Sequence, residues 1–162
     1  MKSIKNFLKV YFIGAGPGDL ELLTLKAVKI IRKADIVIYA GSLVNKDVLK
    51  FARKAAVSYD SAKMNLEEVL GIIEKEKSTK KIIARLHTGD PSLYGAIQEQ
   101  MDWCEKEKID YEVIPGVSSF QAAAASLRQE FTLPGVSQTV LLTRLSGRTK
   151  VPPKEDLAKL AK

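Results

Sequence analysis

Three short turns hold most of the residues in this chain that could bind a ligand. They are GAGPGD at residues 14–19, TGDP at 88–91 and PGVSS at 115–119, and each directly follows an apolar run. In an open parallel α/β sheet the strand-to-helix turns lie along one edge, and ligands bind there. The sequence therefore predicts a binding rim built from three turns.

The first turn is similar to a dinucleotide fingerprint but departs from it. The G-x-G-x-x-G pattern requires glycine at position 19, where this chain has Asp19. An acidic side chain and Pro17, which has no N–H, suit a pyrophosphate poorly. Without a ligand, the same residues make a tight turn with left-handed glycines and with Asp19 capping the next helix.

The second and third turns also have structural explanations. Asp90 before Pro91 is a typical N-cap, and Ser118 or Ser119 could cap a helix in the same way. His87, the single histidine, could shuttle a proton, donate a hydrogen bond to substrate or be a satisfied strand-end residue. We expect no metal site here, because no second His or Cys lies nearby in the sequence. We also do not expect His87 to act as a general base. The G-x-S-x-G spacing of a nucleophile elbow is absent.

Apolar periodicity predicts the elements that position these turns. We expect strands at 10–13, 36–39, 57–59, 81–86 and 111–114, and helices at 22–31, 45–51, 66–75, 93–107 and 119–127. Asn65 and Glu68 form the pattern of a capping box. The alternation predicts an α/β fold, a mostly parallel sheet with helices on both faces.

The pattern breaks at Thr132 to Gly135, which predicts a domain boundary. We expect an N-terminal α/β domain over residues 1–130. Residues 131–162 are interpreted as a linker and the incomplete beginning of a C-terminal domain, with a strand at 139–145 and an amphipathic stretch from Lys154. One strand and the start of a helix cannot bury a core alone.

Composition limits the partners. The chain has 162 residues, 46% of them hydrophobic and 28% charged, and a net charge of +7. The basic residues are scattered, so we expect no nucleic-acid surface; a polyanionic small molecule or a lysine-rich solvated surface explains the excess. The one cysteine, Cys104, fits a reducing cytoplasm, and no run is long enough to span a membrane.

Several longer segments resemble one enzyme family. Besides the three turns, they are IYAGSLV at 38–44, YDSA at 59–62, the stretches 85–101 and 115–125, LPGVSQT at 133–139 and TRLSGRT at 143–149. Together they resemble the tetrapyrrole (corrin/porphyrin) methyltransferases, and within that family the precorrin-4 and cobalt-precorrin-4 C-11 methyltransferase branch.

The resemblance implies S-adenosyl-L-methionine as cofactor, bound in a cleft between two α/β domains. It assigns seven residues to the cofactor site: Pro17, Thr88, Gly89, Asp90, Leu93, Ser118 and Ser119. It assigns six to the tetrapyrrole side: Gly14, Gly16, Gly18, Tyr39, His87 and Tyr94. Relatives that methylate uroporphyrinogen carry an aspartate, proposed as a proton acceptor, where this chain has Ala40. The resemblance therefore supplies no catalytic residue.

The implied activity is methyl transfer to C-11 of precorrin-4 or cobalt-precorrin-4 in cobalamin synthesis, by a cytoplasmic homodimer. Two alternatives stay open: a methyltransferase of the same fold with another substrate, and a catalytically incompetent half-domain. The sequence does not decide whether the substrate carries cobalt.

Overall fold

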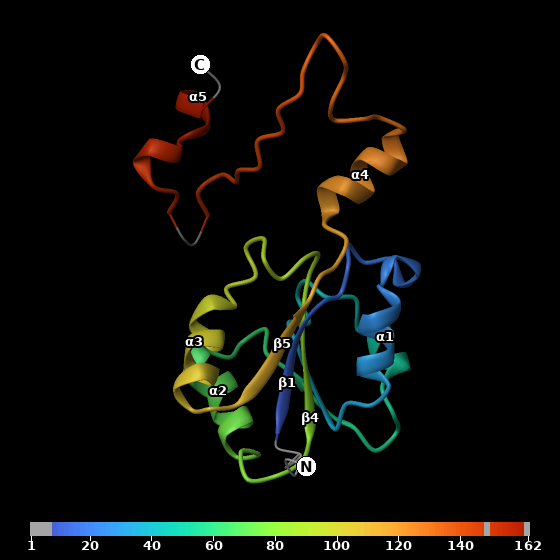
Figure 1. Ribbon diagram of the computed structural model, residues 1–162, viewed down its shortest axis with the longest axis vertical. Coiled ribbons are helices and arrows are strands. Elements are labelled where there is room, and N and C mark those ends of the chain that lie inside the picture. The colour runs from blue at the N-terminus through green and yellow to red at the C-terminus, as the bar shows by residue number, and fades with distance from the viewer. Residues whose placement is uncertain (1–7, 148–149, 161–162) are drawn as a thin grey trace, which may run out of the picture. The chain divides into compact units, whose positions relative to one another are not determined.

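The fold is described by a computed structural model covering residues 8–147 and 150–160 (Figure 1). The chain divides into two compact units, one up to Ala123 and one from Ala124 onward. The first unit contains the sheet and all three glycine-bearing turns.

Five strands form one parallel sheet. They are β1 (Lys9–Gly14), β2 (Ile36–Tyr39), β3 (Val57–Asp60), β4 (Ile82–His87) and β5 (Asp110–Ile114), in the spatial order β3-β2-β4-β1-β5. The central strands are nearly continuous apolar runs because both faces of a parallel sheet are covered. The predicted parallel sheet is confirmed.

Helices cover both faces of this sheet, as predicted (Figure 1). Helix α1 (Leu25–Ile31) packs on one face, together with the 3-10 turns η1 (Leu20–Leu22) and η2 (Lys46–Phe51). Helices α2 (Leu66–Glu74) and α3 (Gln98–Lys106) pack on the other. The predicted capping box at Asn65 and Glu68 is present, with both hydrogen bonds at 2.8 Å.

The order of the strands places a topological switch point at β1 and β4. The connection from β1 runs toward β2 across the α1 face, whereas the connection from β4 runs toward β5 across the α2/α3 face. Crevices of α/β sheets that bind ligands open where such connections diverge. The turns after β1 and β4 therefore stand where the topology favours a site.

The predicted helix at 93–107 begins later than expected, at Gln98. Tyr94 and Ala96 adopt positive φ angles of 60° and 49°, which no right-handed helix can include. Asp90 accordingly caps a turn through Ser92 N–H and does not start a helix. The helix expected from residue 22 is likewise shorter, because Thr24 caps α1 by accepting from Ala27 N–H.

The second unit is mostly irregular. Helix α4 (Ser119–Leu127), predicted from the sequence, spans the division between the units, and only η3 (Pro153–Glu155) and α5 (Leu157–Leu160) follow it among the described residues. The strand expected at 139–145 is wrong: this segment joins no ladder with any described residue, and a strand exists only through its pairing. No helix in the described part of the chain has the length and apolarity that crossing a membrane requires.

The carboxyl end of the sheet is closed by contact between glycine backbones. A Cβ added to Gly116 would lie 2.3 Å from Gly89 O and 2.8 Å from Gly14 Cα. A Cβ added to Gly14 would lie 2.6 Å from backbone atoms of both other glycines. The ends of β4, β1 and β5 therefore meet with no room for side chains between them.

We expect Gly116→Ala to lower the free energy of unfolding by about 1–3 kcal/mol, because backbone atoms must move to admit the methyl group. Gly71→Ala is the matched control, since a Cβ there meets nothing within 4 Å and alanine favours the α2 helix by about 0.5–1 kcal/mol. Urea denaturation of both variants measures the difference. Equal stability would contradict the close contact.

Candidate functional site

The turns after β1 and β4 are joined by a short antiparallel bridge. Gly89 N–H donates to Gly16 O at 2.8 Å, and Gly16 N–H donates to Gly89 O at 3.3 Å. Ala15 N–H also donates to His87 O at 2.7 Å. Gly16 and Gly89 adopt left-handed φ angles of 71° and 60°, which a side chain disfavours. The bridge therefore fixes two of the three predicted turns to each other.

Asp90 joins the second turn to the third. One carboxylate oxygen accepts from Ser92 N–H at 2.8 Å, and the other accepts from Gly116 N–H at 2.9 Å. Gly89 faces Ser118, since a Cβ on Gly89 would lie 3.4 Å from Ser118 Cα. The structure thus brings the turns at 14–19, 88–91 and 115–119 together at one edge of the sheet, as the sequence predicts for a rim.

The residues expected to hold the cofactor differ in accessibility. Thr88, Leu93 and Ser119 are exposed, Pro17 and Asp90 are half-buried, and Gly89 and Ser118 are buried within the contact between turns. The backbone N–H of Ser118 donates to Gln121 Oε1 at 2.9 Å. Of these residues, the exposed members are accessible to a ligand from solvent, while Gly89 and Ser118 lie within the contact between turns.

The residues expected on the tetrapyrrole side are more scattered. Gly14 and Gly16 lie in the joined turns, and Gly18 O accepts from Asn45 Nδ2 at 2.9 Å, which ties the first turn to the β2 connection. Tyr39 is only 7% exposed and packs in the core on the α1 face. Tyr94 is 63% exposed in the loop between β4 and α3.

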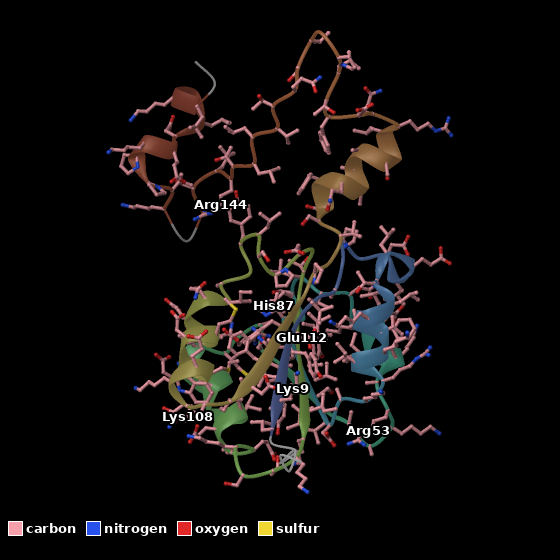
Figure 2. The ribbon with its side chains drawn as sticks, in the orientation of Figure 1. Lys9, Arg53, His87, Lys108, Glu112 and Arg144 are labelled. Carbon is pink, nitrogen blue, oxygen red and sulfur yellow. The ribbon has the colours of Figure 1, made fainter. Side chains whose placement is uncertain are left out.

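His87 ends β4 on the α2/α3 face, beneath that loop (Figure 2). Its side chain is buried, hydrogen-bonds the backbone of Gly95, and leaves Nε2 without a partner in the described structure. Burial, reinforced by the positive charge of Arg85, lowers the pKa of His87 to about 3. The imidazole is therefore neutral at physiological pH, and its low pKa makes it a weak proton acceptor.

Sequence reasoning missed Asp60, which ends β3 at the same edge. Its Oδ1 accepts from Gly41 N–H at 2.9 Å and from Ala62 N–H at 3.0 Å. The hydrogen bond from Ala62 N–H, and to a lesser extent that from Gly41 N–H, lowers the pKa of the Asp60 carboxyl. Asp60 therefore braces the turn after β2 as an ionised carboxylate. Its place directly after a strand was the available signal.

The chemistry that this edge can perform is binding and orientation. Residues 14–19, 88–91 and 115–119 contain no Cys, His or Lys, so these turns offer no thiol, imidazole or amine. Cys104 lies in the core, where burial raises the pKa of its thiol to about 11 and makes it inert. No cluster of three potential metal ligands occurs among residues 8–147 and 150–160.

We expect the His87 imidazole to show no protonation between about pH 5 and pH 8, because its pKa in the folded chain is far below this range. As the only histidine, its ring gives an unambiguous NMR titration. A folded-state pKa below the unfolded value of about 6.5 means that stability is full above that pH and is lost as the pH falls. From about pH 7 to pH 5 the loss due to His87 is about 2 kcal/mol.

His87→Gln removes this contribution and leaves every carboxylate unchanged, so urea denaturation at both pH values isolates it. We expect the variant to lose about 2 kcal/mol less than the parent chain over this interval. An imidazole that titrates near pH 6.5 would contradict its burial.

Known proteins are similar to this chain in both sequence and fold. The chain matches the tetrapyrrole (corrin/porphyrin) methylase family over residues 9–162. It is 57% identical over 157 residues to a cobalt-precorrin-4 C(11)-methyltransferase of Methanocaldococcus jannaschii, with 97% of this chain and 61% of that protein covered. The chain spans about three fifths of the length of the curated relatives it matches.

Two solved structures resemble the fold. The X-ray structure of a cobalt precorrin-4 methyltransferase superposes with a TM-score of 0.89 at 47% identity, over 94% of this chain and 64% of that one. The uroporphyrin-III C-methyltransferase of Thermus thermophilus, solved in complex with S-adenyl homocysteine, gives a TM-score of 0.66 at 31% identity, over 81% and 53%. On both sequence and fold, the chain belongs to the tetrapyrrole (corrin/porphyrin) methylase family.

Proposed function

We propose that this chain is part of an S-adenosyl-L-methionine-dependent methyltransferase that acts at C-11 of precorrin-4 or cobalt-precorrin-4 in cobalamin synthesis. The observation that carries the proposal is the meeting of the turns after β1, β4 and β5 at the topological switch point. The sequence identity of 57% and 47% to two cobalt-precorrin-4 C(11)-methyltransferases supports precorrin-4 or cobalt-precorrin-4 as the substrate.

The exposed groups at this edge suit an S-adenosyl ligand. The hydroxyls of Thr88 and Ser119 can bond ribose or carboxylate oxygens, and Leu93 and Pro17 offer apolar surface. Asp90 is the one carboxylate within the second and third turns, and its negative charge favours a sulfonium nearby. These residues therefore fit the cofactor, which when bound supplies an electrophilic methyl group.

The contribution of the chain to such a reaction is alignment. Holding two reactants in the productive geometry can lower a barrier by roughly 7–11 kcal/mol in ideal cases. The glycine contact and the Asp90 bridge give the turns one arrangement, so a ligand held by Thr88 and Ser119 is held in one place. The proposed reaction thus needs a rigid edge more than an acid–base residue.

The remaining assignments are proposals of the same kind. We place Gly14, Gly16, Gly18, Tyr39, His87 and Tyr94 on the tetrapyrrole side, His87 and Tyr39 acting from beneath the surface because their side chains are buried. A division near residue 130 separates an N-terminal α/β domain from the start of a second one. The whole protein is proposed to act as a cytoplasmic homodimer.

We expect S-adenosylhomocysteine to bind this chain and Gly89→Val to weaken binding at least tenfold. Gly89 has a left-handed φ angle and faces Ser118, so a branched side chain strains the second turn and pushes it from the third. Calorimetric titration measures both affinities, with Gly71→Ala as control. Unchanged affinity in a folded Gly89→Val variant would remove this turn from the site, and no binding by the parent chain would refute the cofactor assignment.

The substrate is tested separately by mass spectrometry of the products after incubation with S-adenosylmethionine. Precorrin-4, cobalt-precorrin-4 and uroporphyrinogen III serve as competing acceptors. Methylation of uroporphyrinogen alone would favour the alternative of a different substrate within the same fold. Cofactor binding without methylation of any acceptor would favour the incompetent half-domain.

A further inference from the structure

A connected group of buried polar side chains lies under the rim. The buried polar residues among those described are Ser61, His87, Gln100 and Ser118. Two of them, Ser61 and Gln100, hydrogen-bond Arg85 of β4, and the charge of Arg85 acts on His87. Burying several polar groups in an otherwise apolar core costs free energy unless each group is hydrogen-bonded, so the partners of these groups indicate what the cluster does.

Hydrogen bonds run continuously through this group from β2 to the loop before α3. Arg85 Nη1 donates to Ser61 Oγ at 2.8 Å, and Ser61 Oγ donates to Tyr39 O at 3.2 Å. In the other direction Arg85 Nε donates to Gln100 Oε1 at 3.4 Å, and Gln100 Nε2 donates to Ala96 O at 3.0 Å. All four bonds point away from the guanidinium, so the positive charge polarises both branches in the same sense.

The chemistry of arginine suits this position. No carboxylate among the described residues lies within ion-pair distance of Arg85, and burial lowers its pKa to about 10, which still leaves it charged at neutral pH. Its planar fork reaches two acceptors in fixed and different directions, whereas a lysine ammonium acts as a point charge. Ser61 and Gln100 lie on different elements, so only the fork holds both.

One branch ends on Tyr39 and the other on the loop 91–97, which follows the second turn. Tyr39 O closes β2 and also accepts from Ser61 N–H at 2.8 Å. Ala96 lies in the loop 91–97, where two residues with side chains adopt positive φ angles. His87 hydrogen-bonds the backbone of Gly95 in the same loop. A loop with such strained residues persists only where its surroundings determine it.

We propose that Arg85 is a positioning residue that sets the loop 91–97 relative to the carboxyl ends of β2 and β3. It acts through Ser61 on one side and through Gln100 on the other, and so fixes Tyr39 relative to the loop that carries Leu93 and Tyr94. The expected effect of Arg85 on ligand binding rests on the proposed function. The positioning of the loop by Arg85 does not.

Hydrogen–deuterium exchange tests the structural content without any ligand. Arg85→Met keeps an unbranched, uncharged stem and removes both donors. We expect about tenfold faster exchange at 41–44 and at 93–97 together, with no change in β1 and β5. In Arg85→Lys the single ammonium reaches one acceptor, so we expect one of the two segments to regain protection.

Arg53→Met is the matched control. Arg53 is an exposed arginine paired with Asp35 just before β2, at the opposite end of the sheet from His87 (Figure 2). We expect its exchange at 41–44 and 93–97 to equal that of the parent chain. Uniformly faster exchange throughout the Arg85→Met chain would show a merely structural role and overturn the proposal. Faster exchange in only one of the two segments, or in neither, would also overturn it.

Calorimetry with S-adenosylhomocysteine tests the consequence. We expect Arg85→Met and Ser61→Ala to bind about tenfold more weakly, although Ser61 lies outside all three turns, and Arg53→Met to bind normally. Normal affinity in Ser61→Ala together with unchanged exchange would refute the coupling. If the parent chain itself does not bind, the cofactor assignment fails, and the exchange experiment still decides the role of Arg85.

Discussion

The contact of three glycine backbones at the carboxyl ends of β4, β1 and β5 is the constraint on which the proposed site depends. Because Gly14 and Gly116 approach each other and Gly89 O closely enough to exclude a Cβ at either position, the backbones of the three turns come into contact, and the first two turns hydrogen-bond each other directly. Asp90 then spans two of these turns with one carboxylate. Most hydrogen-bonding groups of these residues are thus paired with each other across the turns. The groups that remain for a ligand are a few exposed side chains in fixed positions.

Much of this arrangement could be predicted from the sequence, because it follows from local rules. Apolar runs separated by helical periods predicted every strand of the sheet, and the turn residues after 13, 87 and 114 predicted which edge would carry a site. Capping side chains at Asp19 and Asn65 act as their patterns indicate. Parallel strands place their carboxyl ends at one edge whatever their order, so the prediction did not need the order β3-β2-β4-β1-β5.

What the sequence could not supply came from contacts between distant residues. The turn at Tyr94 to Ala96 interrupts a plausible helical pattern, and nothing in that segment alone shows that Gln100 and His87 hold its carbonyl groups from a helix and a strand. Asp60 was missed because its partner Gly41 is 19 residues away. The strand expected at 139–145 failed for the converse reason, since local propensity makes no strand without a pairing partner.

The burial of His87 and the partial burial of Arg85 are linked by electrostatics. A second positive charge beside the guanidinium would find no carboxylate to offset it among the described neighbours, so the imidazole stays neutral and can remain in the core. A neutral ring leaves Arg85 as the charged member of this group, and its field acts on the neutral acceptors of Ser61 and Gln100. The net charge of +7 is therefore a poor guide to recognition in this chain: the half-buried Arg85 is engaged by the side chains of Ser61 and Gln100, and the three turns carry carboxylates and hydroxyls instead of lysines.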